Sequence, residues 1–392
     1  MPSELRSNTR EVRALIASSV KSKRRFRASK GSSELGVGSY PGFSSKDIPD
    51  LTGKVAIVTG ASAGLGFESV LQLAKHNCHV ICIVRNEKKG QEALRKVRQK
   101  SENDKIELEV ADLADLDAIK SFAEKFVARG LPLHILMNNA GITATKFNCT
   151  KDGFEMQWQT NHLAHFYLTL LLLPVLQKTA TADTPVAIHN VSSIGAFAPY
   201  PKDQGGVLEI DDQVNPEIYH PMCAYGQSKL AQIAFTRELA HRLGPKSNVT
   251  VTVCHPGTLI RTEIARKSDY SCFFAHIVDL YSWCFGPSIE KGALTQLYLS
   301  TYPLFPELMT EHPIPNGSMF DYICQLKEIR PNSLAGSEEI RKRVWCISIE
   351  QLKSRGLLIA DVPESPDGDG LARVLSKKSF KMSRINSLMN GA

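Results

Sequence analysis

Short apolar runs alternate with longer segments of helical periodicity along most of the chain. The runs have the length and the β-branched content that are typical of strands buried on both faces of a parallel sheet. They are Lys54–Thr59, His79–Val84, Ile106–Val110, Leu133–Met137, Pro185–Val191, Val249–Cys254 and, as a seventh candidate, Gly317–Cys324. Because crossovers between parallel strands are right-handed, this alternation predicts a Rossmann-type, doubly wound parallel sheet of about seven strands, with helices on both faces.

Between these runs apolar residues recur at the helical period, and this pattern disappears at both ends of the chain. Helices are predicted at Phe67–His76, Gln91–Gln99, Leu116–Arg129, Phe154–Leu176, Tyr225–Arg242, Ser288–Tyr298 and Ser337–Leu352, and a polar loop at 201–222. Residues 1–50 are polar and basic, and residues 356–392 are rich in Pro, Gly, Ser and Lys. We therefore expect one domain over residues 51–355 between two disordered extensions.

A glycine-rich turn joins the first strand to the first helix. Residues Thr59–Gly66 read Thr-Gly-Ala-Ser-Ala-Gly-Leu-Gly. Glycines let backbone N–H groups come close to a pyrophosphate, and a helix N-terminus attracts an anion through its free donors and its dipole. Between a buried strand and a helix, this turn predicts a dinucleotide-binding site.

The ends of the second and third strands indicate which dinucleotide is bound. An NAD site usually has Asp or Glu after the second strand to bind the ribose 2′-hydroxyl, whereas this chain has Arg85. A cation suits a 2′-phosphate, so NADP(H) is expected in preference to NAD(H); the alternative is an exposed arginine that starts a loop. Asp112 follows the third strand, either to bind the adenine amino group or to cap the next helix.

Small and polar residues also follow the later strands. They occur at Asn138–Gly141, Ser192-Ser193 and His255–Thr258. Ligands bind at this edge of an open α/β sheet, so we expect these groups to converge there. The apolar helix 154–176 contains Asn161, whose amide needs a hydrogen-bond partner if it is buried.

Tyr225 and Lys229 lie four residues apart at the start of a predicted helix, so their side chains share one face. A free tyrosine has a pKa of about 10, which is too high for efficient proton transfer near neutral pH. A lysine cation beside it favours the phenolate and lowers this pKa. The pair is therefore a candidate general acid/base.

Charge and cysteine content bear on location and partners. The net charge is +7, with six cations and no acid in residues 21–30 and a second basic cluster at Lys377, Lys378, Lys381 and Arg384. We interpret both clusters as solvated tails, with no nucleic-acid partner and with peripheral membrane contact as the alternative. The nine cysteines show no paired spacing and several lie in apolar runs, which favours reduced thiols. An intracellular protein is expected, cytoplasmic first, mitochondrial or membrane-associated second.

With these motifs in this order, residues 51–350 resemble the short-chain dehydrogenase/reductase superfamily. Its T-G-x-x-x-G-x-G pattern appears at Thr59–Gly66, its N-N-A-G at Asn138–Gly141 and its Pro-Gly at Pro256-Gly257. The segments Asn161–Phe166 and His255–Gly257 look like the retinol dehydrogenase and WW-domain-containing oxidoreductase branch. The tryptophans are Trp158, Trp283 and Trp345, so we expect no WW domain. The family's Thr four residues after the Gly of Pro-Gly is Arg261 here, and Thr262 follows.

The resemblance implies a catalytic tetrad of Asn161, Ser193, Tyr225 and Lys229. Tyr225 would exchange a proton with the substrate oxygen, and Ser193 would hydrogen-bond that oxygen. Lys229 would lower the tyrosine pKa and hold the nicotinamide ribose, and Asn161 would anchor a water of a proton relay. No metal is expected. The expected cofactor contacts are Gly60, Ser62, Gly64, Leu65, Gly66, Arg85, Asp112, Leu113, Asn139, Ala140, Gly141, Tyr225, Lys229, Pro256, Gly257 and Thr258.

Two hypotheses follow from the sequence. The first is an NADP(H)-dependent oxidoreductase that acts on an apolar alcohol or carbonyl compound, such as a retinoid, a steroid or a lipid-derived aldehyde. The second is a catalytically weak, cofactor-binding scaffold that acts through partners. The aromatic segment 268–286 is predicted to be a lid over an apolar substrate, an interfacial membrane helix, or a helix in the core or at a homodimer interface.

Overall fold

The computed structural model describes most of the domain that the sequence predicts. The described residues are 42–143, 145–197, 199, 217, 219–257, 288–311, 313–321, 327–329, 333–357, 359 and 361–366. The basic clusters of both terminal extensions, Thr258, Arg261, Thr262, the aromatic segment 268–286 and most of the predicted loop 201–222 lie outside them.

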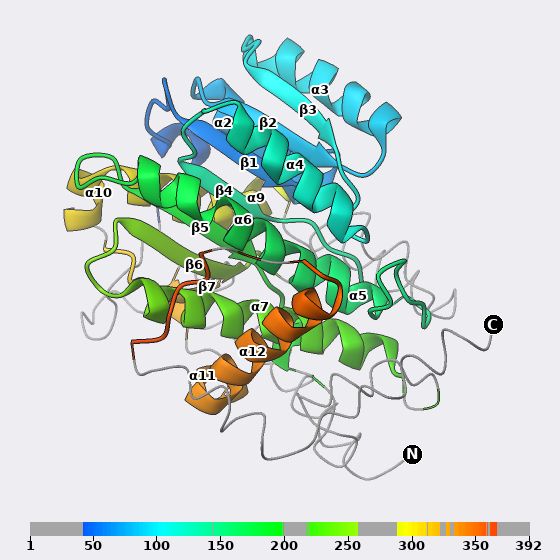
Figure 1. The fold of residues 1–392 in the computed structure, drawn as a ribbon. Coiled ribbons are helices and arrows are strands. Elements are labelled where there is room, and N and C mark those ends of the chain that lie inside the picture. Colours follow the sequence, from blue (N-terminus) through cyan, green and yellow to red (C-terminus); the bar gives the residue numbers. More distant parts are fainter. Residues whose placement is uncertain are drawn as a thin grey trace, which may run out of the picture.

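An eight-stranded sheet runs through the middle of the domain (Figure 1). Its strands are β1 (Val55–Thr59), β2 (His79–Val84), β3 (Ile106–Val110), β4 (Ile135–Asn138), β5 (Val186–Val191), β6 (Val249–His255), β7 (Met319–Asp321) and β8 (Lys327–Ile329). They lie in the order β3-β2-β1-β4-β5-β6-β7-β8, with all neighbours parallel except β7 and β8, which are antiparallel. This confirms the doubly wound parallel sheet. The sequence missed β8, which has three residues and no apolar run.

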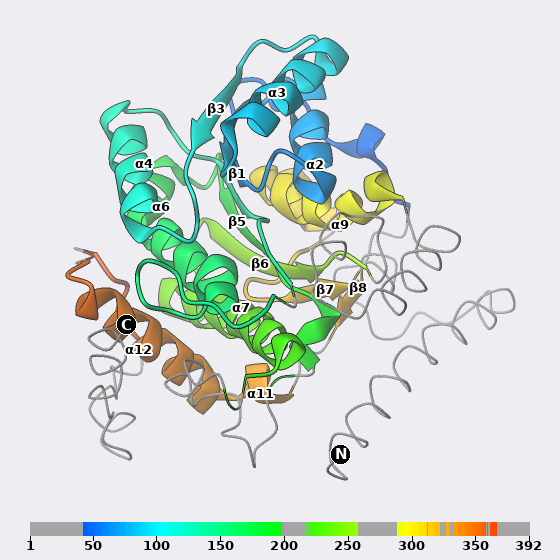
Figure 2. The ribbon, with the colours of Figure 1, turned by 90° about the vertical axis from the view of Figure 1, so that its right-hand side faces the viewer.

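Helices cover both faces of the sheet, as Figure 2 shows from a second side. They are α2 (Gly64–Lys75), α3 (Glu87–Ser101), α4 (Leu116–Ala128), α5 (Met156–Trp158), α6 (Ala164–Thr179), α7 (Pro221–Leu243), α9 (Ile289–Thr301), α10 (Pro306–Glu311), α11 (Ser333–Gly336) and α12 (Glu338–Ser354). Helices α2, α3 and α9 lie on one face and α4, α6 and α7 on the other, with α12 packed on α7. Helix α7 begins inside the predicted loop 201–222, because Pro221 is its first residue and His220 caps it.

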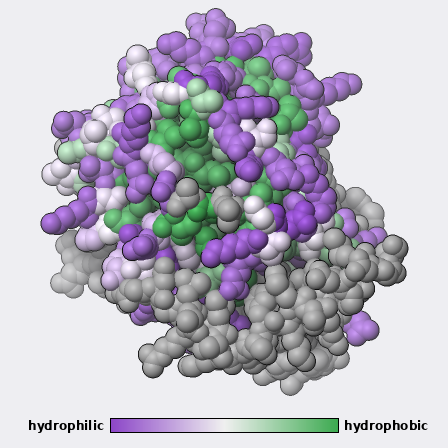
Figure 3. Space-filling view, viewed as in Figure 1, coloured by the Kyte–Doolittle hydropathy of each residue, from purple (hydrophilic) through white to green (hydrophobic). Residues whose placement is uncertain are grey.

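Each face of the sheet has its own apolar layer. On β1, Val55 and Ile57 pack in the layer under α4, α6 and α7, whereas Ala56 and Val58 pack in the layer under α2 and α9. This alternation follows from the two-residue period of a strand, and a slip of one residue would exchange the two sets. On the coloured part of the face seen in Figure 3, polar side chains prevail at the rim, and apolar side chains show in the middle, around α4 and α6.

The packed core includes residues near both ends of the described chain. Phe43 is buried, with ring centroids 5.3 Å from Tyr298 and 5.4 Å from Tyr302. Leu357 is also buried, and the guanidinium of Arg242 donates a hydrogen bond to the carbonyl oxygen of Pro363. Phe43 lies before residue 51, and Leu357 and Pro363 lie after residue 355, the predicted limits of the domain.

A buried ion cluster joins α12 to α7. The Glu238 carboxylate is fully buried and lies 2.8 Å from Arg242 Nε and 3.5 Å from Arg341 Nη1 of α12. The Arg242 guanidinium also lies 4.3 Å from the centre of the Trp345 ring, which is the range of a cation–π contact. One carboxylate thus compensates two cations between the helices, and it holds α12 in place on α7.

Replacing Glu238 by alanine is expected to lower the free energy of unfolding by about 3–5 kcal/mol, because it leaves a buried guanidinium without its counter-charge. Urea denaturation at neutral pH measures this loss. Glu92→Ala is the matched control, since Glu92 forms an i,i+4 pair with Lys96 on the exposed face of α3. A surface pair contributes little, so the control should unfold almost like the wild type. Equal losses in the two variants would contradict the role given to the buried cluster.

Candidate active site

The predicted site residues meet at the carboxyl-terminal edge of the sheet. The glycine turn follows β1, Asn139–Gly141 follow β4, Ser193 follows β5 and Pro256 follows β6. Helix α7 carries Tyr225 and Lys229 in its early turns and packs against β5, β6 and the segment after β5. The glycine turn, the residues after β4, β5 and β6, and the start of α7 therefore lie together at one edge of the sheet, as the sequence predicts, because parallel strands have their carboxyl ends at the same edge.

The glycine turn leaves room for a backbone-bound ligand. Gly60 and Gly64 have φ angles of +68° and +57°, which glycine adopts at little cost. A Cβ at Gly66 would overlap the Gly60 carbonyl oxygen and would lie 2.5 Å from Asn139 Nδ2. Helix α2 starts at Gly64, and Ala63 before it offers no side-chain cap. The first N–H groups of α2, beside the half-buried Ser62 and Leu65, could therefore hold an anion such as a pyrophosphate.

The end of β1 is fixed by the hydroxyl group of Thr59. Thr59 Oγ1 accepts hydrogen bonds from the backbone N–H groups of Asn139 and Ala140, at 2.9 and 3.0 Å. It lies 2.9 Å from Nε2 of the buried His165 on α6. His165 Nδ1 lies 2.9 Å from the Asn161 carbonyl oxygen, which can only accept, so Nδ1 carries the proton and Nε2 accepts from Thr59. These bonds tie the turns after β1 and β4 to the helix that follows Asn161.

Ser193 and Tyr225 face each other in the site. Burial raises the pKa of the Tyr225 phenol, and a hydrogen bond with Ser193 opposes that rise. A Cβ at Gly195 would lie 2.8 Å from Cε1 of the Tyr225 ring, so only glycine fits there. Ser192 points elsewhere and donates to the Lys229 carbonyl oxygen at 2.8 Å. The structure thus places Ser193, and not Ser192, beside the tyrosine, which agrees with the choice that the family resemblance implies.

Lys229 is buried behind Gly141. Its Nζ donates to the Val191 carbonyl oxygen at 2.8 Å and to Gln232 Oε1 at 3.0 Å. A Cβ at Gly141 would lie 3.3 Å from Lys229 Nζ and equally far from Asn161 Oδ1, so the ammonium and the Asn161 amide both reach the turn after β4. The burial of Lys229 lowers its pKa to about 7.

The pKa of Tyr225 corrects one expectation from the sequence. Lys229 was expected to lower it, but the net shift is upward, because desolvation of the phenol is the largest cause and the hydrogen bond with Ser193 opposes it only in part. The physical reason is that burial disfavours the charged phenolate. The sequence gives the spacing of Tyr225 and Lys229, but it does not show that both side chains are buried, and burial decides the direction of the pKa shift.

Asn161 lies in one turn of π-helix, Gln159–Leu163, between α5 and α6. Such turns are rare and occur often at functional sites. The amide makes three hydrogen bonds: Oδ1 accepts from Ile142 N at 2.8 Å, and Nδ2 donates to Ile142 O and to Ser228 Oγ, both at 2.9 Å. Asn161 therefore fixes the turn after β4 to α7, which answers the expected need for a partner.

The residues predicted to select the dinucleotide lie at the ends of β2 and β3. Arg85 is exposed directly after β2, where a phosphate can reach it. Asp112 accepts from the backbone N–H of Ala114 at 3.0 Å, whereas Asp115 caps α4 by accepting from Ala118. The alternative of Asp112 as a helix cap is therefore wrong, because Asp115, directly before Leu116, is the N-cap of α4. Leu113 is buried beside it.

After β6 the described chain stops at Gly257. Pro256 is buried, and Gly257 has a φ angle of +120°. His255, at the end of β6, accepts a hydrogen bond from the Ile194 backbone N–H at 3.1 Å. It thereby holds the segment that carries Ser193. The predicted contact of Thr258 lies outside the described residues.

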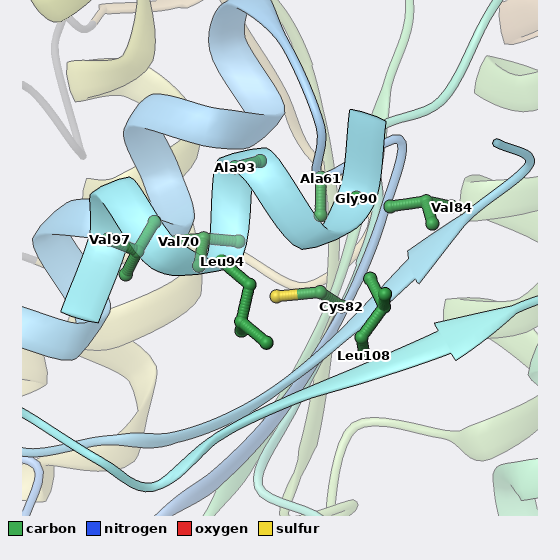
Figure 4. A pocket seen from close by; sticks show the side chains of 9 residues that line it. All are labelled: Ala61, Val70, Cys82, Val84, Gly90, Ala93, Leu94, Val97 and Leu108. Carbon is green, nitrogen blue, oxygen red and sulfur yellow. The ribbon is translucent and has the colours of Figure 1, made fainter. Parts of the chain in front are cut away.

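An apolar pocket lies beneath the dinucleotide edge, between α3 and the strands β2 and β3 (Figure 4). The side chains that line it are Ala61, Val70, Cys82, Val84, Ala93, Leu94, Val97 and Leu108, together with Gly90. None of them carries a charge, and the Cys82 thiol is kept neutral because burial raises its pKa to about 12. A ligand would find no polar group for orientation there, so we interpret this pocket as a packing gap under α3.

Sequence reasoning assigned no role of their own to three residues that hold the site. They are His165, Gln232 and His255. His165 gave one signal that could have been used, since it lies four residues after Asn161 on an apolar helix and would be buried there. Gln232 gave none beyond its place one turn after Lys229.

Comparisons with known proteins agree with this geometry. The family described as short chain dehydrogenase matches residues 54–271. An uncharacterized oxidoreductase of Schizosaccharomyces pombe is 39% identical over 73% of this chain and 81% of its own length. The human WW domain-containing oxidoreductase is 35% identical over 78% of this chain and 70% of its own. The mouse protein named retinol dehydrogenase 12 is 34% identical over 77% of this chain and 87% of its own.

A solved structure shows the same fold. An uncharacterized protein of Mycobacterium paratuberculosis is 28% identical, with a TM-score of 0.59, over 80% of this chain and 98% of its own. The chain belongs to the short chain dehydrogenase family, in the branch of the retinol dehydrogenases and WW domain-containing oxidoreductases. It is therefore an NAD(P)-dependent dehydrogenase or reductase.

Gly66→Ala is expected to abolish dinucleotide binding, because the added methyl group would collide with the Gly60 backbone and the Asn139 amide. Quenching or enhancement of NADPH fluorescence on titration with the protein measures binding. Gly336→Ala is the control, since no atom lies within 4 Å of a Cβ there. Unchanged NADPH binding by Gly66→Ala would show that the turn does not hold the cofactor.

Proposed function

We propose that the protein is an NADP(H)-dependent oxidoreductase that interconverts an apolar alcohol and the corresponding carbonyl compound, with Tyr225 as general acid/base. The observation that carries the proposal is the buried contact between Tyr225 and Ser193, one helical turn from the ammonium of Lys229. This group lies at the same sheet edge as the glycine turn, so a dinucleotide held there would reach it.

The described residues fit a dinucleotide. Gly66 is needed because a side chain there would collide with the Gly60 backbone, and no side chain of Ala63 caps the start of α2. Backbone N–H groups at this point can therefore bind a pyrophosphate. Arg85 is exposed where the ribose 2′-position would lie, which favours a phosphate there and hence NADP(H) over NAD(H). When bound, the dinucleotide supplies or takes the hydride, and the protein supplies orientation and proton transfer.

In the direction of carbonyl reduction, the Ser193 hydroxyl orients the substrate oxygen and stabilises the charge that develops on it. Tyr225 donates its phenolic proton to that oxygen, which leaves a phenolate. A buried phenolate is costly, as the raised pKa of Tyr225 shows. The nearby Lys229 ammonium offsets this cost, so its protonated form is the one that supports the reaction.

The substrate class rests on the relatives. The mouse relative bears the name retinol dehydrogenase, and retinol is an apolar alcohol. We therefore assign this chain an apolar alcohol or carbonyl compound: a retinoid, a steroid or a lipid-derived aldehyde or ketone. Among the helices of the described part of the chain, none is long and apolar enough to cross a membrane.

Tyr225→Phe is expected to lower kcat by about 10²–10⁴-fold, because the ring still packs against Gly195 but has no proton to donate. Loss of NADPH absorbance with a panel of retinal, steroid ketones and long-chain aldehydes measures turnover. NADPH binding should be preserved. Tyr167→Phe is the matched control, since Tyr167 is a buried tyrosine of α6 in the apolar layer between helices.

Two results would count against this proposal. Turnover retained by Tyr225→Phe would exclude the tyrosine as general acid. Tight NADPH binding by the wild type without turnover of any panel member would favour the scaffold hypothesis.

Arg85→Asp is expected to weaken NADPH binding by about 10–100-fold and to leave NADH binding nearly unchanged, because it removes a charge-assisted contact with the 2′-phosphate. Equilibrium fluorescence titrations with both nucleotides give the two affinities. Arg95→Asp makes the same charge change further along α3, on another exposed position. An equal loss of NADPH and NADH affinity in Arg85→Asp would rule out its role in selectivity.

A further inference from the structure

Lys229 has a partner on its own helix that the reaction described above does not use. Gln232 lies three residues further along α7, so the two side chains share one face. Its Oε1 accepts a hydrogen bond from Lys229 Nζ at 3.0 Å, and only 1% of its surface is exposed. The Val191 carbonyl oxygen is the other acceptor, at 2.8 Å.

The orientation of the Gln232 amide follows from this contact. An ammonium group can only donate hydrogen bonds, so the oxygen of the amide faces Lys229 and the nitrogen faces away. Gln232 Nε2 lies 3.5 Å from His165 Nδ1, which donates its proton to the Asn161 carbonyl oxygen. The Gln232 N–H and the His165 Nδ1–H are both donors, so this 3.5 Å contact is a packing contact and not a hydrogen bond. The bond to Lys229 is what orients the amide.

We propose that Gln232 is a positioning residue that holds the Lys229 ammonium at the sheet edge and keeps it charged. The inference rests on the proposed function, in which the charged form of Lys229 stabilises the Tyr225 phenolate. A hydrogen bond to a charge is stronger in a buried site than in water. Because the amide is neutral, it accepts a hydrogen bond from the ammonium without cancelling the positive charge. A carboxylate at this place would form an ion pair with Lys229 and would weaken the stabilisation of the Tyr225 phenolate.

Other titratable side chains reach this part of α7 from three elements. They are Tyr225 on α7 itself, His165 on α6, and Cys254 and His255 at the end of β6. Burial lowers the pKa of His165 and of His255 to about 4, so both are neutral near pH 7, and the raised pKa of Tyr225 keeps the phenol neutral as well. The titrations of His165, His255 and Tyr225 therefore do not overlap that of Lys229 near neutral pH.

The test is the titration of Lys229 in full-length Gln232→Met, which keeps the length of the side chain and removes the acceptor. NMR of protein labelled with ¹³C at lysine Cε follows it, with the resonance assigned by its loss in Lys229→Met. Loss of a hydrogen bond to a charged group should lower the Lys229 midpoint by about one to two pH units. The loss of kcat/KM on the basic side of the pH profile should move down with it, since Lys229 then loses its proton at lower pH.

Two variants complete the design. Gln227→Met is the matched control, because Gln227 is equally buried on α7 but lies on the opposite side of the helix from Lys229; its midpoint should equal that of the wild type. Gln232→Glu keeps the shape of the side chain and should raise the midpoint, which tests the proposal even where the methionine variant does not fold.

The outcomes separate this inference from the proposed function. An unchanged midpoint in Gln232→Met, or equal shifts in Gln232→Met and Gln227→Met, would overturn the role of Gln232. A shifted midpoint in a protein that turns over no carbonyl compound would support Gln232 as the partner of Lys229 and would count against the proposed reaction instead.

Discussion

The site depends on hydrogen bonds between polar side chains that are buried at the edge of a parallel sheet. A buried donor or acceptor without a partner costs about 1–3 kcal/mol, so each polar group there fixes the position of another. Asn138 on β4 donates to Asn190 on β5 and to Thr169 on α6, and Asn190 donates in turn to Thr236 on α7. Two strands and two helices are thereby held in one arrangement beneath the reacting groups.

The same burial decides the electrostatics of the site. Desolvation disfavours the charged form of every group, so it raises the pKa of Tyr225 and lowers that of Lys229. Both effects oppose the phenolate and ammonium pair that proton transfer requires. The structure counters them with neutral dipoles, the Ser193 hydroxyl for the tyrosine and the Val191 carbonyl group for the lysine. In the resting site, hydrogen bonds to neutral groups therefore set the protonation of Tyr225 and Lys229, and no permanent ion pair between them is needed.

Much of this arrangement could be predicted from the sequence. The strand runs are local signals, and a parallel sheet brings all their ends to one edge, so the grouping of the glycine turn, Ser193 and Tyr225 follows from topology alone. What could not be predicted depends on contacts across the fold. The pairing of the three-residue strand β8 with β7, and the link from Thr59 through His165 to the Asn161 carbonyl group, leave no periodic pattern in the sequence.

The C-terminal helix α12 belongs to the same system although it lies far from the reacting groups in sequence. Its Ser348 lies 2.8 Å from Nε2 of His162, and its Gln351 accepts from the Trp158 indole N–H at 2.8 Å. Trp158 directly precedes the π-helical turn that carries Asn161, and His162 lies within that turn; the Glu238 cluster fixes the other side of α12 to α7. A π-helical turn is less stable than regular α-helix, so it persists only where its surroundings hold it. Helix α12 supplies those surroundings, so the geometry of the site depends on a helix that is distant in sequence from the reacting groups.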